Sequence, residues 1–286
     1  MNLPPVLQST IHSFLQTPVL SAQSISGGCI HQSFKLQTLR GPYFLKFNEW
    51  KLTENLQAEK KGLERLGATE SLRVPRILQQ GEAETHTYLL LEWIESRGEA
   101  EDYWEQLGKG LANLHQHTQA HFGLDDDNFI GALPQSNTAT NNWADFFIEQ
   151  RIHPLLKSGR EKGYITPSLE AKFQQFLKKV PDIFPEEAPA LIHGDLWGGN
   201  LLAGPQGEPV MIDPAVYYGH REMELSFMTL FDKQPDTFYR TYESIRPLAP
   251  DFPSRVKYYN LYPLLVHLNL FGTSYLSGIE QSLKGF

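Results

Sequence analysis

Three polar side chains in one short stretch of this 286-residue chain have types and spacing suited to chemistry on phosphates. Asp195 and Asn200 stand five positions apart on a glycine-rich segment, and Asp213 follows an apolar run thirteen positions later. A carboxylate can orient an acceptor hydroxyl and take its proton. Carboxylate and amide oxygens are also suitable Mg²⁺ ligands. We therefore predict that Asp195 is a catalytic base and that Asn200 and Asp213 are magnesium ligands.

The spacing of these residues matches that of the catalytic base and the metal ligands in protein kinases. His193-Gly194-Asp195 stands in place of the kinase His-Arg-Asp, and Asp213-Pro214-Ala215 stands in place of Asp-Phe-Gly. We expect His193 to brace the loop rather than to react. Two unrelated turns capped by Asp side chains are the alternative. Two such turns in this order, with Asn200 in its place, favour phosphoryl transfer.

A lysine and a glutamate nearer the N-terminus fit the phosphate end of the same reaction. Lys46 lies in the strand-like run Tyr43–Phe47, and Glu59 follows thirteen positions later in a helical pattern. This spacing is typical of a strand lysine that contacts the α- and β-phosphates and is held by a helix carboxylate. An exposed strand lysine and a solvated helix face are the alternatives, and Glu54 is the second choice of partner.

Two further segments are predicted to contact the nucleotide. Gly27 and Gly28 precede the first hairpin, where backbone amides can approach phosphates closely; the chain contains no Walker A motif. Glu92, Trp93 and Ile94 end an apolar run and are predicted to present backbone groups to the nucleotide base. A core strand followed by a linker would have the same sequence pattern.

The elements that must position these residues divide the chain in two. Residues 1–95 predict a hairpin (33–39 and 43–47, turning at Gly41-Pro42), one helix (53–66) and a buried strand (87–94). Residues 96–286 predict helices at 103–117, 142–156, 168–180 and 258–270, with a strand–loop–strand block at 190–214. We predict an α+β, protein-kinase-like bilobal fold. Residues 1–95 form a small β-rich ATP-binding lobe, and residues 96–286 form a larger helical lobe for catalysis and substrate binding.

Composition narrows the class of protein. The chain has 25 Lys and Arg against 33 Asp and Glu, a net charge of −8, and the whole excess lies after residue 95. This balance argues against a nucleic-acid partner, which needs clustered basic residues. The apolar runs are too short to span a membrane. The first residues show no secretory signal, so we expect a cytoplasmic protein.

Longer runs of sequence point to one family. The runs His193–Asn200 and Ile212–Glu222 (IDPAVYYGHRE) resemble those of the fructosamine kinase (ketosamine 3-kinase) family, within the aminoglycoside phosphotransferase superfamily. The likeness extends along nearly the whole chain, including Gly27–Ile30 and Asp127–Gly131. Two positions depart from the family pattern, which usually has an acidic residue where His220 stands and Asp where Glu224 stands.

The resemblance implies ATP-dependent phosphorylation of the sugar 3-hydroxyl of ketosamines, with Mg²⁺, in the deglycation of amines or proteins. It implies Asp195 as base and Glu92–Ile94 as ATP contacts. A kinase of another alcohol, such as an aminoglycoside or choline, is the enzymatic alternative. An inactive nucleotide-binding scaffold is the other, and the presence of all four kinase residues (Lys46, Asp195, Asn200 and Asp213) argues against it.

The remaining candidates have structural alternatives of equal or greater weight. Trp197 is predicted either to stack on a sugar or to pack against its own lobe. Arg221 and Glu222 are expected to form a buried pair with each other. His115, His117 and His121 lack the spacing of a zinc helix, so helix-end packing is the better interpretation.

Cys29 is the single cysteine, which excludes an internal disulfide. It stands in the predicted phosphate loop, where backbone amides lower a thiol pKa. We predict that oxidation at Cys29, or a disulfide linking two chains, inhibits ATP binding, so the protein is a monomer or a redox-sensitive dimer. Phosphotransfer assayed before and after peroxide treatment tests this prediction, and unchanged activity would contradict it.

Overall fold

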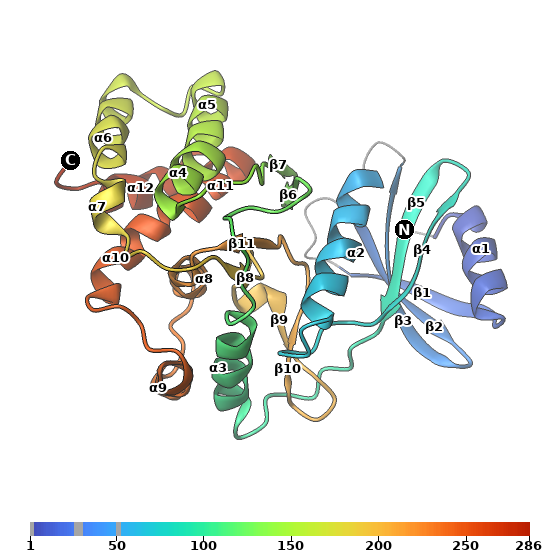
Figure 1. The fold of residues 1–286 in the computed structure, drawn as a ribbon. Coiled ribbons are helices and arrows are strands. Elements are labelled where there is room, and N and C mark those ends of the chain that lie inside the picture. The colour runs from blue at the N-terminus through green and yellow to red at the C-terminus, as the bar shows by residue number, and fades with distance from the viewer. Residues whose placement is uncertain (1–2, 26–30, 50–52) are drawn as a thin grey trace. The chain divides into compact units, whose positions relative to one another are not determined.

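The structure is a computed structural model that describes residues 3–25, 31–49 and 53–286 (Figure 1). The chain folds into two compact units. Unit 1 comprises residues 1–103 and 202–214, and unit 2 comprises residues 104–201 and 215–286. We predicted a single division after residue 95. The boundary instead follows residue 103, and residues 202–214 belong to unit 1. Hydrogen bonds join residues 202–214 to the rest of unit 1. Met211 N–H donates to Arg73 O (2.9 Å), and Ala100 N–H donates to Gly207 O (3.0 Å).

Unit 1 is built on a five-stranded antiparallel sheet with strand order β1-β2-β3-β5-β4 (Figure 1). Its elements are α1 (Pro5–Leu15), β1 (Val19–Ile25), β2 (Gln32–Thr38), β3 (Gly41–Glu49), α2 (Thr53–Gly67), β4 (Ile77–Ala83) and β5 (His86–Glu92). The short strands β9 (Leu201–Ala203) and β10 (Pro209–Met211) pair with each other.

The alternation of side chains along β3 explains where Lys46 points. Leu45 and Phe47 belong to the cluster that packs against α1, whereas Phe44 packs with the α2 leucines. Because successive strand residues face opposite sides of a sheet, Lys46 shares the α2 side with Phe44. On α2, Leu56, Glu59 and Leu63 recur at helical spacing and are buried.

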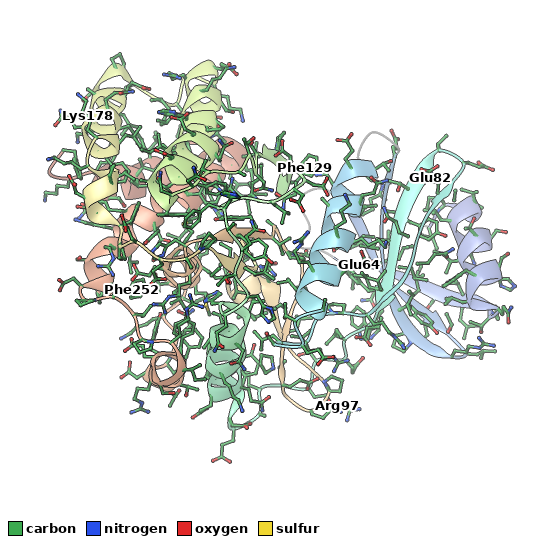
Figure 2. All side chains as sticks on the ribbon, in the orientation of Figure 1. Glu64, Glu82, Arg97, Phe129, Lys178 and Phe252 are labelled. Carbon is green, nitrogen blue, oxygen red and sulfur yellow. The ribbon has the colours of Figure 1, made fainter. Side chains whose placement is uncertain are left out.

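The opposite side of α2 is polar. Glu64 pairs with Lys60 (3.0 Å) one turn earlier, and its side chain is drawn in Figure 2. A surface pair of this kind contributes a few tenths of a kcal/mol, about 0.3–0.5. The helix is therefore held mainly by its buried face, which carries Glu59.

Unit 2 is mostly helical, with two small sheets. Its helices are α3 (Tyr103–Leu114, beginning at the unit boundary), α4 (Trp143–Phe146), α5 (His153–Glu161), α6 (Pro167–Leu177), α7 (Val180–Ile183), α8 (Arg221–Met228), α9 (Asp236–Ile245), α10 (Phe252–Tyr259), α11 (Leu261–Phe271) and α12 (Leu276–Ser282). A π-helix η2 (Phe147–Ile152) and 3₁₀ turns η3 (Gly198–Asn200) and η4 (Thr273–Tyr275) connect some of them. The pairs β6 (Asn128–Ile130) with β7 (Leu133–Gln135), and β8 (Ala190–Ile192) with β11 (Tyr217–Gly219), form the sheets.

The predicted α+β class is confirmed, and several element boundaries differ from the predictions. The first hairpin turns at residues 39–40, so Gly41-Pro42 already belongs to β3. The helix expected over 142–156 is three segments with a π-helical middle, and the one expected over 258–270 breaks at Asn260. The sequence patterns did not predict α1, β1 or α8. Among the described residues, no helix has the length and apolar character needed to cross a membrane.

Candidate active site

In unit 1 the ammonium of Lys46 lies between two carboxylates. Its Nζ is 2.8 Å from Glu59 Oε1 and 2.5 Å from Asp213 Oδ1. The side chains of Lys46 and Glu59 are 6% and 10% exposed, whereas that of Asp213 is 41% exposed. The predicted pairing of Lys46 with Glu59 is therefore present. Glu54 is exposed and does not replace Glu59.

Burial and charge oppose each other in this group. Burial alone would lower the pKa of Lys46, but the nearby carboxylates of Asp213 and Glu59 outweigh it and raise that pKa. Burial raises the pKa of Glu59 against the attraction of Lys46, and the negative charge of Asp213 adds to the rise. Lys46 is thus a permanent cation that two carboxylates share.

His31 lies beside this group, just before β2. Burial and the positive charge of Lys46 lower the pKa of His31 to about 4, although Asp213 acts in the opposite direction. The imidazole is consequently neutral at pH 7. The sequence interpretation did not single out His31, because only the fold places it near Lys46.

In unit 2 the side chain of Asn200 holds the loop that carries Asp195. Asn200 Nδ2 donates to the backbone oxygen of Asp195 (2.8 Å) and to its carboxylate Oδ2 (3.0 Å). Both hydrogen bonds use the amide nitrogen, so the Oδ1 atom is the part of Asn200 suited to a metal ion. The structure brings Asp195 and Asn200 together as the spacing predicted.

The turn between β8 and Asp195 requires glycine at position 194. Gly194 has φ +83°, and an added Cβ would lie 2.1 Å from the backbone oxygen of Ala215. Ala215 N–H donates to His193 O (2.9 Å), and Asp195 N–H reaches His193 Nδ1 (3.3 Å). His193 is fully buried and braces the loop as expected.

Glu224 of α8 anchors the same loop. Its carboxylate accepts the backbone N–H groups of His193 (3.1 Å) and Gly194 (2.8 Å) and contacts His115 Nε2 (3.0 Å). His115 and Glu224 have no exposed side-chain surface. Sequence reasoning noted Glu224 only as a departure from a family pattern; no local signal placed it against the loop.

The protonation of this pair follows from burial and hydrogen bonding. Burial would raise the pKa of Glu224, but the hydrogen bonds from His115 and the Gly194 N–H lower it. Burial lowers the pKa of His115 more than Glu224 raises it. A neutral His115 therefore carries its proton on Nε2, facing the carboxylate, and its Nδ1 accepts the Tyr242 hydroxyl (2.7 Å).

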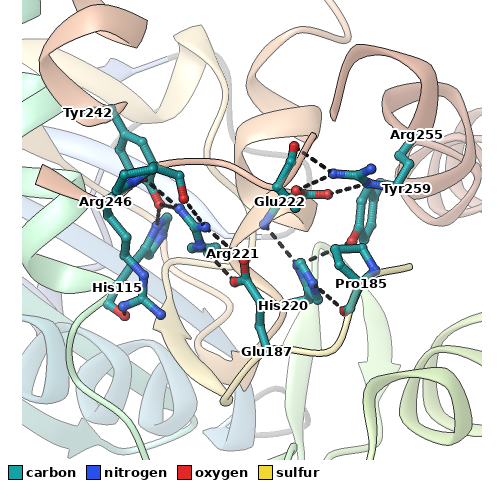
Figure 3. Close-up of polar contacts among 12 residues, drawn as sticks. His115, Pro185, Glu187, His220, Arg221, Glu222, Tyr242, Arg246, Arg255 and Tyr259 are labelled. Carbon is teal, nitrogen blue, oxygen red and sulfur yellow. Dashed lines mark hydrogen bonds and ion pairs between the residues drawn. The ribbon is translucent and has the colours of Figure 1, made fainter. Parts of the chain in front are cut away.

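The prediction that Arg221 pairs with Glu222 is wrong, although both are buried. Arg221 makes two 2.7 Å bonds with Glu187, and Glu222 makes bonds of 2.7 and 2.8 Å with Arg255 (Figure 3). Neighbouring residues on a helix point about 100° apart, so each finds a partner on a different segment. Both pairs fix the start of α8, which carries Glu224.

The predicted nucleotide-base segment lies at the end of β5. Glu92 uses its backbone N–H for Arg76 O (2.9 Å), and its carboxylate accepts Arg76 N–H (3.0 Å). Trp93 is partly exposed, with Lys35 Nζ 4.1 Å from its ring centroid, and Ile94 is buried. The ATP contacts of these three residues stay a prediction.

Among the remaining predicted residues that the structure describes, only His115 belongs to the two groups around Lys46 and Asp195. Gly27, Gly28 and Cys29 lie outside the described residues. Trp197 is 37% exposed and meets Phe231 edge to face with ring centroids 5.6 Å apart. His115 is a buried member of the Glu224 network, whereas His117 and His121 are exposed.

The oxygen donors of Asn200 and Asp213 fit Mg²⁺ by their chemistry. Asp213 has φ +55° and uses Oδ1 for Lys46, so its second oxygen remains for another ligand. In the described part of the chain, no group of three or more His, Cys, Asp or Glu side chains could hold a metal ion. Few protein ligands are normal for Mg²⁺ at nucleotide sites, where phosphates and water complete the shell.

Comparisons with known proteins cover nearly the whole chain and agree on one family. The family model described as Fructosamine kinase matches residues 6–286. A protein of Synechocystis named probable ketoamine kinase is 40% identical, over 99% of this chain and 98% of its own. The chloroplastic protein-ribulosamine 3-kinase of Arabidopsis thaliana is 33% identical, over 100% of this chain and 88% of its own.

Solved structures agree as well. A crystal structure from Thermobifida fusca, provisionally named a fructosamine-3-kinase, is 30% identical with a TM-score of 0.86, and the match covers 97% of each chain. Aminoglycoside phosphotransferase APH(4)-Ia is 16% identical with a TM-score of 0.65, covering 98% of this chain and 97% of its own. The second likeness shows the fold alone.

We predict that Glu224→Gln lowers both stability and kcat. The side-chain NH2 group of the new glutamine would face N–H groups of the loop or of His115, and two donors cannot form a hydrogen bond. A buried polar group left without a partner costs about 1–3 kcal/mol. Glu170→Gln is the matched control, since Glu170 of α6 bonds Arg160 (3.2 Å) instead of the loop; kcat should stay within about twofold. Equal kcat in both variants would contradict the anchoring role of Glu224.

We also predict a pH-dependent contribution from His31. Its folded pKa is lowered, so its contribution is complete above the unfolded pKa of about 6.5 and is lost as pH falls towards about 4. The free energy of unfolding of the native protein should therefore fall relative to that of His31→Asn over this range. Urea titrations at pH 7.5, 6, 5 and 4.5 measure the difference, and parallel pH dependence of the two proteins would refute it.

Proposed function

Because this chain belongs to the fructosamine kinase family, we propose that it transfers the γ-phosphoryl group of ATP to the 3-hydroxyl of ketosamines. Family members are phosphotransferases that act on a hydroxyl group. The names of its relatives, ketoamine kinase and protein-ribulosamine 3-kinase, support fructosamines and ribulosamines as the substrate class. The 3-phosphorylated product decomposes and frees the amine, so the role is deglycation of amines or proteins.

The arrangement of Asp195 carries this proposal. Its carboxylate is held by Asn200 at 3.0 Å, on a turn that Gly194 and Glu224 fix. A positioned carboxylate can accept the hydroxyl proton as the substrate oxygen bonds to phosphorus and ADP leaves. Phosphoryl transfer depends mainly on such positioning and on charge neutralisation, with little covalent work by the protein.

The Lys46 group supplies the positive charge for the phosphates. A buried ammonium held by Glu59 is oriented before ATP arrives, which reduces the entropy cost of binding. Asp213 bonds Lys46 with one oxygen, and we propose that it and Asn200 hold Mg²⁺. When bound, Mg²⁺ would neutralise charge on the nucleotide phosphates. Gly27 and Gly28 as phosphate-loop residues, and Glu92–Ile94 as base contacts, complete the proposal.

Neither alternative has comparable support. An inactive scaffold would not need Lys46 and Asp195 each held by dedicated partners. A preference for aminoglycosides would rest on structural neighbours at 12–16% identity, a level that shows the fold alone.

We predict that Asp195→Asn lowers kcat by about 10²–10⁴-fold with ribulosyl-lysine or fructosyl-lysine, because the amide cannot accept the proton. ATP binding, measured by calorimetry, should stay within a few-fold. Asp182→Asn makes the same chemical change at an exposed position of unit 2 and should keep full activity. Undiminished turnover by Asp195→Asn would exclude Asp195 as base, and turnover of choline or an aminoglycoside in place of both ketosamines would overturn the substrate class.

A further inference from the structure

Unit 2 carries a continuous row of aromatic side chains that begins beside the Asp195 loop. Trp197 contacts Phe231 (5.6 Å between ring centroids), and Phe231 contacts His267 (5.1 Å). His267 in turn contacts Phe271 (5.5 Å) and Tyr275 (5.0 Å). We call these five residues the aromatic row. It starts two residues from Asp195 and ends at η4.

The aromatic row is open to solvent. Trp197, Phe231 and Phe271 are 37%, 43% and 50% exposed. In the part of the chain that the structure describes, they are three of the seven exposed large hydrophobic residues. Scattered single residues of this kind are ordinary, whereas a connected set beside a proposed active site is typical of a binding surface.

A carboxylate borders the row near its start. Asp232 follows Phe231, and a Cβ added to Gly198 would lie 3.0 Å from Asp232 Oδ2. Gly198 is the residue after Trp197, so the carboxylate lies against the turn that holds the tryptophan. Asp232 is exposed, and the exposed Lys233 follows it in the chain.

His267, in the middle of the row, adds no positive charge. Its Nδ1 is 2.7 Å from Pro263 O, and because a carbonyl can only accept, Nδ1 carries the proton. Burial lowers the pKa of His267 despite this hydrogen bond. The ring is therefore neutral at pH 7 and does not repel a cation.

A ketosamine has two parts, a sugar that receives the phosphate and a carrier joined through a secondary amine. With the sugar hydroxyl at Asp195, the row offers rings to a carrier that extends beyond the amine. Alkyl chains and ammonium groups bind exposed aromatic faces, and a nearby carboxylate strengthens binding of the cation. A carrier of one carbon offers a single methyl group to the row, whereas a lysyl carrier offers four methylenes.

Building on the proposed function, we propose that the aromatic row and Asp232 bind the carrier, specifically the lysyl side chain of a glycated peptide. Phe231, Phe271 and Tyr275 pack on its methylene chain, and Asp232 faces its secondary ammonium. The surface then selects lysyl carriers over short amines by binding, without altering the phosphoryl step.

The test compares two substrates that share one sugar: a short peptide carrying ribulosyl-lysine, and ribulosyl-methylamine. Phe271→Ser should raise KM for the peptide about tenfold at unchanged kcat, because binding is lost equally from ground and transition states. Its kinetics with ribulosyl-methylamine should change less than twofold. Asp232→Asn should raise KM for both substrates, because both carry the secondary ammonium, with a loss that shrinks at high salt. Melting temperatures verify that both variants fold.

Phe14→Ser is the matched control, an equally exposed phenylalanine (42%) on α1 of unit 1, and should leave both substrates unaffected. A peptide KM that is unchanged in Phe271→Ser, or a loss in Phe271→Ser that is equal for both substrates, overturns the carrier surface while turnover of ribulosyl-methylamine still supports the kinase. If the native protein phosphorylates neither ketosamine, both the carrier surface and the proposed function fail.

Discussion

A carboxylate that is shielded from solvent must accept hydrogen bonds from other groups of the protein. Glu224 accepts them from the loop that precedes Asp195. The N–H groups of His193 and Gly194, together with His115, satisfy its two oxygens. All eight residues of α8 are buried, so the helix cannot shift without breaking these bonds. Arg221–Glu187 and Arg255–Glu222 fix the start of α8 in turn (Figure 3). The position of Asp195 thus depends on residues outside the proposed catalytic set.

Unit 1 applies the same physical rule to a cation. Lys46 is buried, which would be costly for an unpaired ammonium, and Glu59 and Asp213 supply the compensating charge. Glu59 is fixed by the buried face of α2, whereas Asp213 is the more exposed of the two carboxylates. One partner therefore holds the lysine, and the other keeps access to a further ligand. This division of roles agrees with a lysine that binds phosphates.

The spacing of residues along the sequence predicted the pairs of site residues that lie close together in the chain. Asp195 and Asn200 lie on one short loop, and Lys46 and Glu59 have the thirteen-residue spacing of a strand lysine and its helix carboxylate. The sequence did not predict Glu224 against the loop, or Glu187 and Arg255 as the partners of Arg221 and Glu222. These contacts join segments 30 or more residues apart, and no local pattern encodes the direction in which a buried helix turns its side chains. The sequence did not predict the aromatic row for the same reason. The row brings together Trp197, Phe231 and residues 267–275, which are far apart in the chain.

The proposed function rests on phosphorylation of oxygen 3 of a ketosamine sugar. Phosphorus-31 and proton NMR of the product formed from ribulosyl-lysine and ATP test it most directly, because coupling of phosphorus to a carbon-bound proton identifies the esterified oxygen. We expect coupling to the proton on carbon 3, followed by release of free lysine as the product decomposes. A phosphate on another sugar oxygen, or a product that never frees its amine, would contradict it.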